Sequence, residues 1–315
     1  MAARSLLGVL TSVTPAPELG RDIYTNQGPL IQQPVGEAAF GGSILSQAIS
    51  AAAATVQPLL HVVSSQSSFL RPVQASSHVH YHVERTSDGR TSATRVVRAT
   101  QGGGGPCLYV AIISFQTHGL VTPANNEHNA LKYAEPLPDL GGLHPHSIPK
   151  QDFPQLFQLS DESLQVLSKF GVSADDPFDW RLLPLEKSVC KSNSAQIHTY
   201  AFVRAEPRST HSGISHLAAM AFLSDISLLE LSLMANWESV HEDARALAMS
   251  TTLNSQITLH SPTARIDEWM VCESGISWVK GGRVTNYQRF WNAANGEILM
   301  ECTQDAIIKH GRAQI

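Results

Sequence analysis

Residues 40–56 read FGGSILSQAISAAAATV, an alanine-rich apolar segment that opens with two glycines. Its composition predicts a helix. Short segments rich in β-branched and aromatic residues follow it, separated by turn residues such as Asp88-Gly89 and the glycines at 102–105. The expected strands cover residues 62–63, 67–72, 78–84, 91–99 and 108–116. The first part of the chain therefore predicts one helix followed by an antiparallel meander.

The same order of elements recurs from about residue 208. The pattern predicts a helix over 214–234 and strands over 251–259, 268–274, 284–292 and 298–308. Sequence landmarks repeat in the same order: Arg71-Pro72 matches Ser261-Pro262, Gly89-Arg90 matches Gly282-Arg283, and Ser114-Phe115-Gln116 matches Cys302-Thr303-Gln304. Two halves with one order of landmarks indicate an internal duplication.

The repeat divides the chain into three parts. Residues 1–118 are expected to form an N-terminal unit, and residues 207–315 a C-terminal unit. Residues 119–206 hold 8 of the 17 prolines and show weak periodicity. They predict a long connection with one short helix near residues 161–170.

Bulk composition excludes several classes of protein. A chain of 315 residues with 43% hydrophobic residues has room for two core-bearing domains. Its net charge of −5 gives no reason to expect a nucleic-acid partner, and no apolar run approaches the length of a membrane span. Four scattered cysteines without a CxxC pair indicate reduced thiols inside a cell, in the cytoplasm or the peroxisome. The final Ala-Gln-Ile is at most remotely similar to the peroxisomal Ser-Lys-Leu signal.

One polar residue falls in the apolar segment of the second half. Asp225 lies in the predicted helix 214–234, and an isolated buried carboxylate costs several kcal/mol (~3–5) unless it is compensated. Asp225 is either a structural residue, bonded to Ser224, Ser227 or a facing arginine, or it is part of a site. Thr252 and Gln304 lie on strands that should pass beside that helix. Three polar residues converging there favour a site.

The ordered motifs resemble type II acyl-CoA thioesterases. In the first half the resemblance rests on residues 40–48, 68–72, 88–90 and 113–116; in the second half it rests on 223–226, 250–253, 259–262 and 302–305. It implies an α+β double hot-dog fold, with each antiparallel sheet wrapped around one long helix. It also implies an enzyme of lipid or secondary metabolism that hydrolyses acyl-CoA, uses no metal or other cofactor, and forms homo-oligomers.

The resemblance assigns catalysis to Asp225, Thr252 and Gln304, with Thr251 as the alternative if the strand register shifts by one. Thioester hydrolysis needs an oriented water, a proton acceptor and donors for the oxyanion. One carboxylate is sufficient, because the leaving thiolate is a weak base with a conjugate-acid pKa of ~8.5. Asp225 can serve as the base, or as a nucleophile through an anhydride.

Glycines before the two predicted helices are candidates for substrate binding. Backbone N–H groups at a helix N-terminus bind anions, so Gly41, Gly42 and Gly213 could approach the oxyanion. Alternatively they only allow close packing of helix and sheet. Arg71, together with Arg90 and Lys280, could contact CoA phosphates, although each could equally be an ordinary exposed base.

Some residues depart from the family pattern. Asn254-Ser255, the stretch from Gln256, and Gln66 stand where the family usually has other residues, and they are expected near the acyl pocket. They leave two alternatives open: a dehydratase, isomerase or cyclase acting on a polyketide-like substrate, or a non-catalytic acyl-binding protein. The alternating histidines at 78, 80 and 82 have a possible metal-ligand spacing, but a polar sheet face is the favoured interpretation.

Overall fold

The computed structural model describes residues 5–32, 38–117, 133–150, 177–183, 198–206, 215–226 and 247–310. The helices are α1 (Leu6–Thr11), α2 (Gly41–Ala53), the short 3-10 helix η2 (Pro145–Ser147) and α5 (His216–Leu223). The strands of the first half are β1 (Val13–Pro15), β2 (Ile23–Asn26), β3 (Leu60–Phe69), β4 (His80–Asp88), β5 (Ser92–Thr100) and β6 (Tyr109–Thr117). Those that follow are β7 (Phe178–Leu182), β8 (His198–Ala205), β9 (Leu247–Leu259), β10 (Met270–Lys280), β11 (Arg283–Asn292) and β12 (Ile298–His310).

All these strands form one antiparallel sheet in the order β1-β2-β4-β5-β6-β3-β9-β12-β11-β10-β8-β7. The two halves join where β3 pairs with β9, and Gln66 lies opposite Gln256 at the centre of this pairing. Joining the halves along these strands covers an edge that each half would otherwise expose. The sheet is therefore continuous across the duplication.

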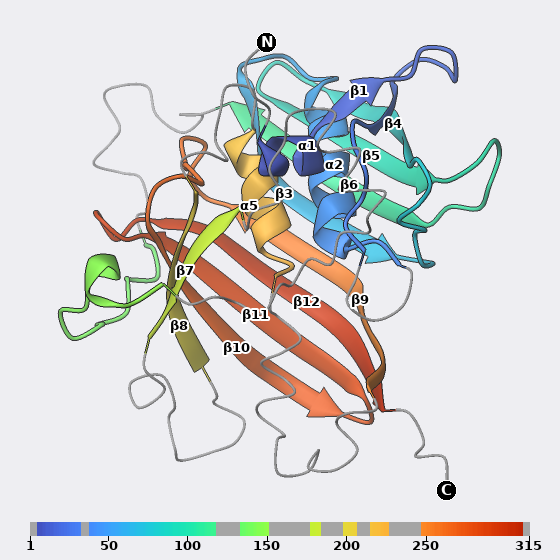
Figure 1. Cartoon of the computed structure of the whole chain (residues 1–315). Coiled ribbons are helices and arrows are strands. Elements are labelled where there is room, and N and C mark those ends of the chain that lie inside the picture. Colours follow the sequence, from blue (N-terminus) through green and yellow to red (C-terminus); the bar gives the residue numbers. More distant parts are fainter. Residues whose placement is uncertain are drawn as a thin grey trace, which may run out of the picture.

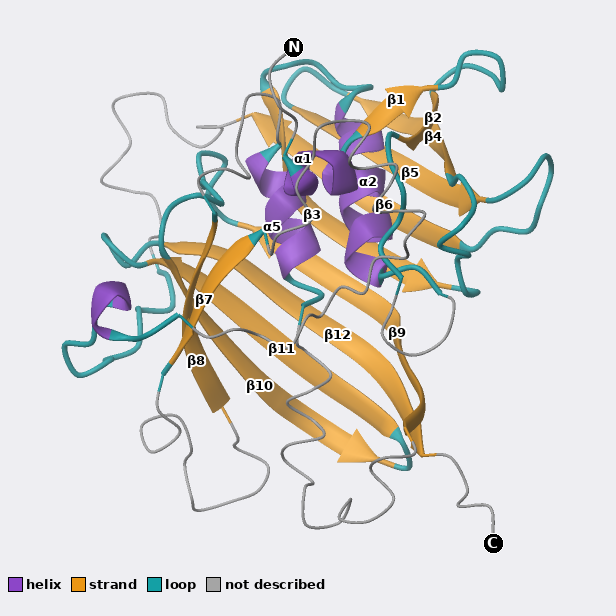
Figure 2. Cartoon of the chain, viewed as in Figure 1, coloured by secondary structure: helices purple, strands orange, loops and turns teal. Residues whose placement is uncertain are grey.

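Helices α2 and α5 lie side by side against one face of the sheet (Figures 1 and 2). The main apolar core fills the space between them and the sheet, and it includes Ile44 and Ile49 of α2, Met220 and Phe222 of α5, and Tyr109 of β6. Burying the apolar face of each element against the other accounts for this layered arrangement. We call this side of the sheet the inner face.

A second apolar cluster covers part of the opposite, outer face. Phe202, Val271 and Trp291 alternate along their strands with residues of the main core, so they point the other way. Segment 133–150 packs over them, and the indole N–H of Trp291 donates to the backbone oxygen of Glu135 at 3.0 Å. Part of the predicted connection thus forms a layer on the second half of the sheet.

The sequence predicted the elements of the meanders better than those of the connection. Helix α2, strands β4 to β6 and strands β9 to β12 lie close to where the two halves were expected to have them, and the two strands expected over 62–63 and 67–72 are one strand, β3. Helix α1 and strands β1 and β2 were not predicted. Strands β7 and β8 fall inside residues 119–206, which were expected to be a connection, and they extend the sheet beyond β10. The short helix expected near 161–170 lies outside the described residues, and the division into three parts stays a prediction.

In the described part of the chain, no helix is long and apolar enough to cross a membrane.

Candidate active site

Asp225, Thr252 and Gln304 meet on the inner face. The side-chain N–H of Gln304 donates to Oδ1 of Asp225 at 2.9 Å. The Thr252 hydroxyl lies 3.4 Å from the same oxygen and 3.3 Å from Oε1 of Gln304, so its single proton can serve either acceptor. Gln304 also approaches the backbone oxygen of Ser224 at 3.5 Å. The three residues that the sequence singled out therefore form one hydrogen-bonded group.

The carboxylate occupies a turn just after a helix. Helix α5 ends at Leu223 with Ser224 as its C-cap, and Asp225 follows, with its backbone N–H donating to the oxygen of Phe222 at 3.3 Å. The expected helix over 214–234 is thus confirmed over 216–223, the expectation that Asp225 lies within it is wrong, and residues 227–246 lie outside the described ranges. A helix C-terminus disfavours a negative charge. Asp225 needs compensation from elsewhere.

Burial raises the pKa of Asp225 from 3.8 to about 6. Hydrogen bonds from Gln304, from the backbone N–H of Gly42 and from Thr252 act in the opposite direction, because they stabilise the ionised form. The residue as a whole remains partly accessible to solvent. The result is a carboxylate that is mostly ionised at neutral pH but basic enough to accept a proton.

A β-bulge selects Thr252 for the site. The β9–β12 register shifts between Asn254 and Thr252, so Leu253 is an extra residue without a partner on β12. Thr252 and Ser255 are consequently both buried, whereas Asn254 between them is exposed. Thr251, the alternative, directs its hydroxyl to the backbone oxygen of Thr252 at 3.5 Å. The structure thus brings Thr252, and not Thr251, to Asp225.

The N-terminus of α2 faces the same carboxylate. A Cβ atom added to Gly41 would lie 2.7 Å from Oδ2 of Asp225, and one added to Gly42 would lie 2.7 Å from the backbone oxygen of Phe222. Gly42 therefore allows the two helices to pack closely, while Gly41 leaves space at the carboxylate. The packing interpretation thus fits Gly42, and substrate binding by Gly41 stays a prediction. Gly213 lies outside the described residues.

The first half has no equivalent polar group. Gln66 and Gln256 pair at the centre of the β3–β9 junction, so residues at the same distance from each are equivalent in the two halves. Four residues before Gln66 and Gln256 are Val62 and Thr252, respectively. On the neighbouring strands, Ile113 pairs with Ser65 as Gln304 pairs with Ser255. The equivalent of Gln304 is thus Ile113, and the landmark match with Gln116 was wrong by three residues. Apolar Val62 and Ile113 replace two members of the group.

Most of the residues that depart from the family pattern do not reach the inner face. Gln66, Asn254 and Gln256 are exposed, whereas Ser255 is buried. The exposed residues line a shallow outer-face pocket of about 390 Å³ over the β3–β9 junction. The expectation that these departures lie together near the acyl pocket is thus wrong for Gln66, Asn254 and Gln256, whereas Ser255, Ile257 and Leu259 are buried, because alternation along a strand separates adjacent residues onto opposite faces.

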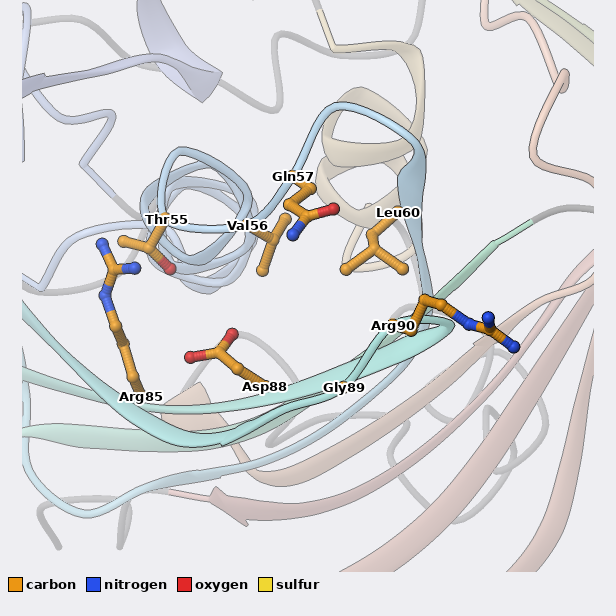
Figure 3. Close-up of a pocket in the computed structure, with 8 residues that line it drawn as sticks. All are labelled: Thr55, Val56, Gln57, Leu60, Arg85, Asp88, Gly89 and Arg90. Atoms are coloured by element: carbon orange, nitrogen blue, oxygen red, sulfur yellow. The ribbon is translucent and has the colours of Figure 1, made fainter.

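The basic candidates lie apart from the hydrogen-bonded group. Arg71 is exposed just after β3, two residues beyond Phe69. The ring of Phe69 lies near the N-terminus of α2, because a Cβ atom added to Gly41 would be 3.3 Å from it. Arg90 lines a pocket of about 600 Å³ at the other end of α2, next to Thr55 and Gln57. In Figure 3 its guanidinium points away from the end of the helix, while Asp88 points toward it. This pocket is separate from Asp225.

The histidine-rich strand does not gather ligands. His82 approaches the Thr100 hydroxyl at 3.0 Å, and His78 precedes β4. Within the described ranges, no group of three histidine, cysteine, aspartate or glutamate side chains could hold a metal ion.

Two aromatic residues beside the site were missed by the sequence analysis. The rings of Phe69 and Tyr109 pack edge-to-face with centroids 5.0 Å apart, and Tyr109 is fully buried. Burial raises the pKa of Tyr109, and the charge of Asp225 raises it further, so the phenol stays neutral near the carboxylate. Alternation along the two strands was the signal that could have placed both residues on the inner face.

Known proteins share this architecture. The chain matches the family models for the acyl-CoA thioesterase N-terminal domain over residues 31–116 and the acyl-CoA thioesterase C-terminal domain over 151–308. It is 28% identical to acyl-coenzyme A thioesterase 8 of Rattus norvegicus, over 97% of this chain and 90% of the relative.

Solved structures agree with the fold. Acyl-CoA thioesterase II TesB2 of Mycobacterium marinum superposes with a TM-score of 0.69 at 19% identity, covering 97% of this chain and 99% of the other. A hot-dog protein of unknown function from Alicyclobacillus acidocaldarius gives 0.68 at 14% identity, covering 98% of each chain. The expected double hot-dog fold is therefore confirmed. By the match of both family models, this chain belongs to the acyl-CoA thioesterase family.

Proposed function

We propose that this member of the family hydrolyses acyl-CoA thioesters at Asp225 by attack of an activated water. The observation that carries the proposal is the group itself: a carboxylate whose pKa is raised to about 6, held by an amide and a hydroxyl and facing a helix N-terminus. A base that titrates near the working pH combines a high ionised fraction with a useful proton affinity.

In the proposed mechanism, Asp225 and Thr252 hold a water beside the thioester carbonyl. The water oxygen forms a bond to the carbonyl carbon while its proton passes to Asp225. The tetrahedral intermediate then collapses, the carbon–sulfur bond breaks, and the proton passes from Asp225 to the departing thiolate. The products are a carboxylic acid and CoA. Since an alkyl thiolate is a good leaving group at pH ~8 and below, no stronger acid is needed.

Gln304 and the N-terminus of α2 have supporting roles in this proposal. Gln304 fixes one carboxylate oxygen by its 2.9 Å hydrogen bond, which leaves the other for the water. The backbone N–H groups of Gly41 and Gly42 stand at the positive end of the α2 dipole, where a developing oxyanion is stabilised. Gly42 first donates to Asp225, and its donation can pass to the oxyanion as the carboxylate takes up the proton.

Free-thiol release from a panel of acyl-CoAs tests the proposal. We expect turnover by the wild type and a loss of about 10³-fold or more in kcat/KM for Asp225→Asn, which cannot accept the proton. Asp305→Asn is the matched control. Asp305 lies one residue after Gln304 on β12 and accepts from the Thr285 hydroxyl at 2.7 Å, so its variant should keep activity. Wild-type rates in Asp225→Asn would contradict the mechanism.

Arg71 is the proposed contact for the CoA phosphates, since it is exposed two residues after Phe69, whose ring lies close to Gly41. We expect Arg71→Ala to raise KM for acyl-CoA but not for the corresponding N-acetylcysteamine thioester, which has no phosphates. Equal effects on both substrates would remove Arg71 from phosphate binding.

We further propose that the protein acts in the cytoplasm or the peroxisome and forms homo-oligomers. The described cysteines, Cys107, Cys272 and Cys302, are unpaired, as in a reducing compartment. Ile112 is 50% exposed on the outer face near the central strands, where a second copy could cover it. Imaging of an N-terminally tagged protein tests the compartment, and light scattering tests the assembly.

A further inference from the structure

A row of polar side chains crosses the inner face, where a sheet buries apolar residues. Ser67 of β3, Ser255 of β9, Gln304 of β12 and Asn286 of β11 are successive partners across four strands. Their exposed fractions are 7%, 2%, 1% and 0%, respectively. We call these four residues the polar row. It extends on both sides of Gln304, which holds Asp225.

Hydrogen bonds within the protein do not account for all of this polarity. Ser67 donates to the backbone oxygen of Ser255 at 3.2 Å, but the Ser255 hydroxyl has no hydrogen-bond partner of good geometry among the described residues. The thiol of Cys302 approaches it, and a thiol is a weak hydrogen-bonding group. The hydroxyl of Ser65, on β3 beside the row, is also buried and without a partner in the described part. Buried polar groups are normally paired, so each of these hydroxyls is available to a polar atom of a ligand.

The unpaired hydroxyl of Ser255 lies one strand away from the reacting group. Ser255 and Gln304 are direct partners, so their Cα atoms are about 4.5–5.5 Å apart. In a thioester bound beside Asp225, two carbon–carbon bonds separate the carbonyl carbon from the third carbon of the acyl chain, a distance of about 2.5 Å, so an oxygen on that carbon and a hydrogen bond of about 2.8 Å together cover the spacing to Ser255. A plain methylene there would leave the Ser255 hydroxyl unpaired. A hydroxyl or oxo oxygen on that carbon would pair with it.

We propose that Ser255 selects acyl groups that carry an oxygen substituent on the third carbon, such as 3-hydroxyacyl thioesters. This inference rests on the proposed hydrolysis at Asp225 and names the substrate class of that site. Ser65, across the β3–β9 junction, extends the polar lining farther from the carboxylate.

The test compares a 3-hydroxyacyl-CoA with the unsubstituted acyl-CoA of the same length. We expect the wild type to prefer the hydroxylated substrate by about tenfold in kcat/KM, and Ser255→Ala to lose that preference. Ser68→Ala is the matched control, because Ser68 lies next to Ser67 but donates to Asn254 on the outer face at 2.8 Å; its preference should match the wild type. Because Ser255→Ala removes an unpaired hydroxyl, its melting temperature should equal or exceed that of the wild type.

Two other results would overturn the inference: a wild type that prefers the unsubstituted substrate, or an equal loss for both substrates in Ser255→Ala. Binding of the two non-hydrolysable thioether analogues separates this inference from the proposed function. One outcome is that no acyl-CoA is hydrolysed, the wild type binds the hydroxylated analogue more tightly than the unsubstituted one, and Ser255→Ala binds the two equally. In that case the hydrolysis proposal fails and the selectivity stands. Equal binding of both analogues by the wild type removes the selectivity.

Discussion

Replacing Asp225 by asparagine should abolish activity and at the same time stabilise the fold. In the folded protein burial raises the pKa of this carboxyl from 3.8 to about 6, so keeping it ionised at pH 7 opposes folding. At about 1.4 kcal/mol per pH unit, the difference corresponds to about 3 kcal/mol. Asparagine carries no charge but must place an NH₂ group among donors such as Gly42 N–H. We therefore expect Asp225→Asn to gain about 1–2 kcal/mol at pH 7.

The sign of this effect gives it a distinctive pH dependence. A carboxyl whose folded pKa is raised favours folding when protonated, and that contribution is lost as the pH rises from 3.8 to about 6. Asp225→Asn should therefore be the more stable protein above pH ~6, whereas below pH ~4 the wild type with its protonated carboxyl should be more stable by about 1–2 kcal/mol. Above pH ~6 the melting temperature of the variant should be higher by a few degrees, ~2–5 °C.

Urea unfolding and thermal scans over this pH range, together with thiol release, measure both effects. The Asp305→Asn protein again serves as the control. An Asp225→Asn variant that is less stable than the wild type at pH 7 would refute the argument, because the ionised carboxylate would then contribute favourably to the fold. A stability difference independent of pH would also refute it, since titration of Asp225 is the stated cause.

Three further predictions concern the titration of Asp225 and the two ends of α2. Because Asp225 must be ionised to accept a proton, and its pKa is about 6, kcat/KM should fall about tenfold per pH unit below pH 6 and level off above it, as a pH–rate profile would show. Gly41→Ala places a Cβ 2.7 Å from Oδ2 of Asp225 and should lower kcat/KM by about 10²-fold. Gly103→Ala is the control, because a Cβ there meets nothing within 4 Å, and it should match the wild type. Wild-type kcat/KM in Gly41→Ala would contradict the close approach of Gly41 to the carboxylate. Arg95 is fully buried and donates to the side-chain and backbone oxygens of Thr55 just after α2. Arg95→Ala should therefore lower the free energy of unfolding in urea by about 3–5 kcal/mol. A loss below ~1 kcal/mol would show that these hydrogen bonds contribute little.

The amino-acid sequence alone determined the strands of the two meanders, helix α2 and their order. Residues 40–56 carry strong helix formers and open with glycines, and the strands after them alternate in polarity between turn residues, so local preference and periodicity were sufficient. Strands β7 and β8 were missed because they are short, lie among prolines and form only by pairing with β10 and with each other. Such pairing is not a local property.

The candidate site was identified from Asp225, a carboxylate in an apolar segment, together with a family resemblance for Thr252 and Gln304. Only the tertiary structure decided which face each neighbour occupies. The bulge at Leu253 turns Thr252 inward and Asn254 outward, and the β3–β9 junction makes Ile113 the equivalent of Gln304. A shift of one residue in register reverses the face of a strand residue, and register is set by partners that are distant in the sequence, such as Ala306 for Thr252 and Ser255 for Ser67. The sequence thus determined which residues carry the chemistry, and the packing of the two halves decided that they meet at the N-terminus of α2.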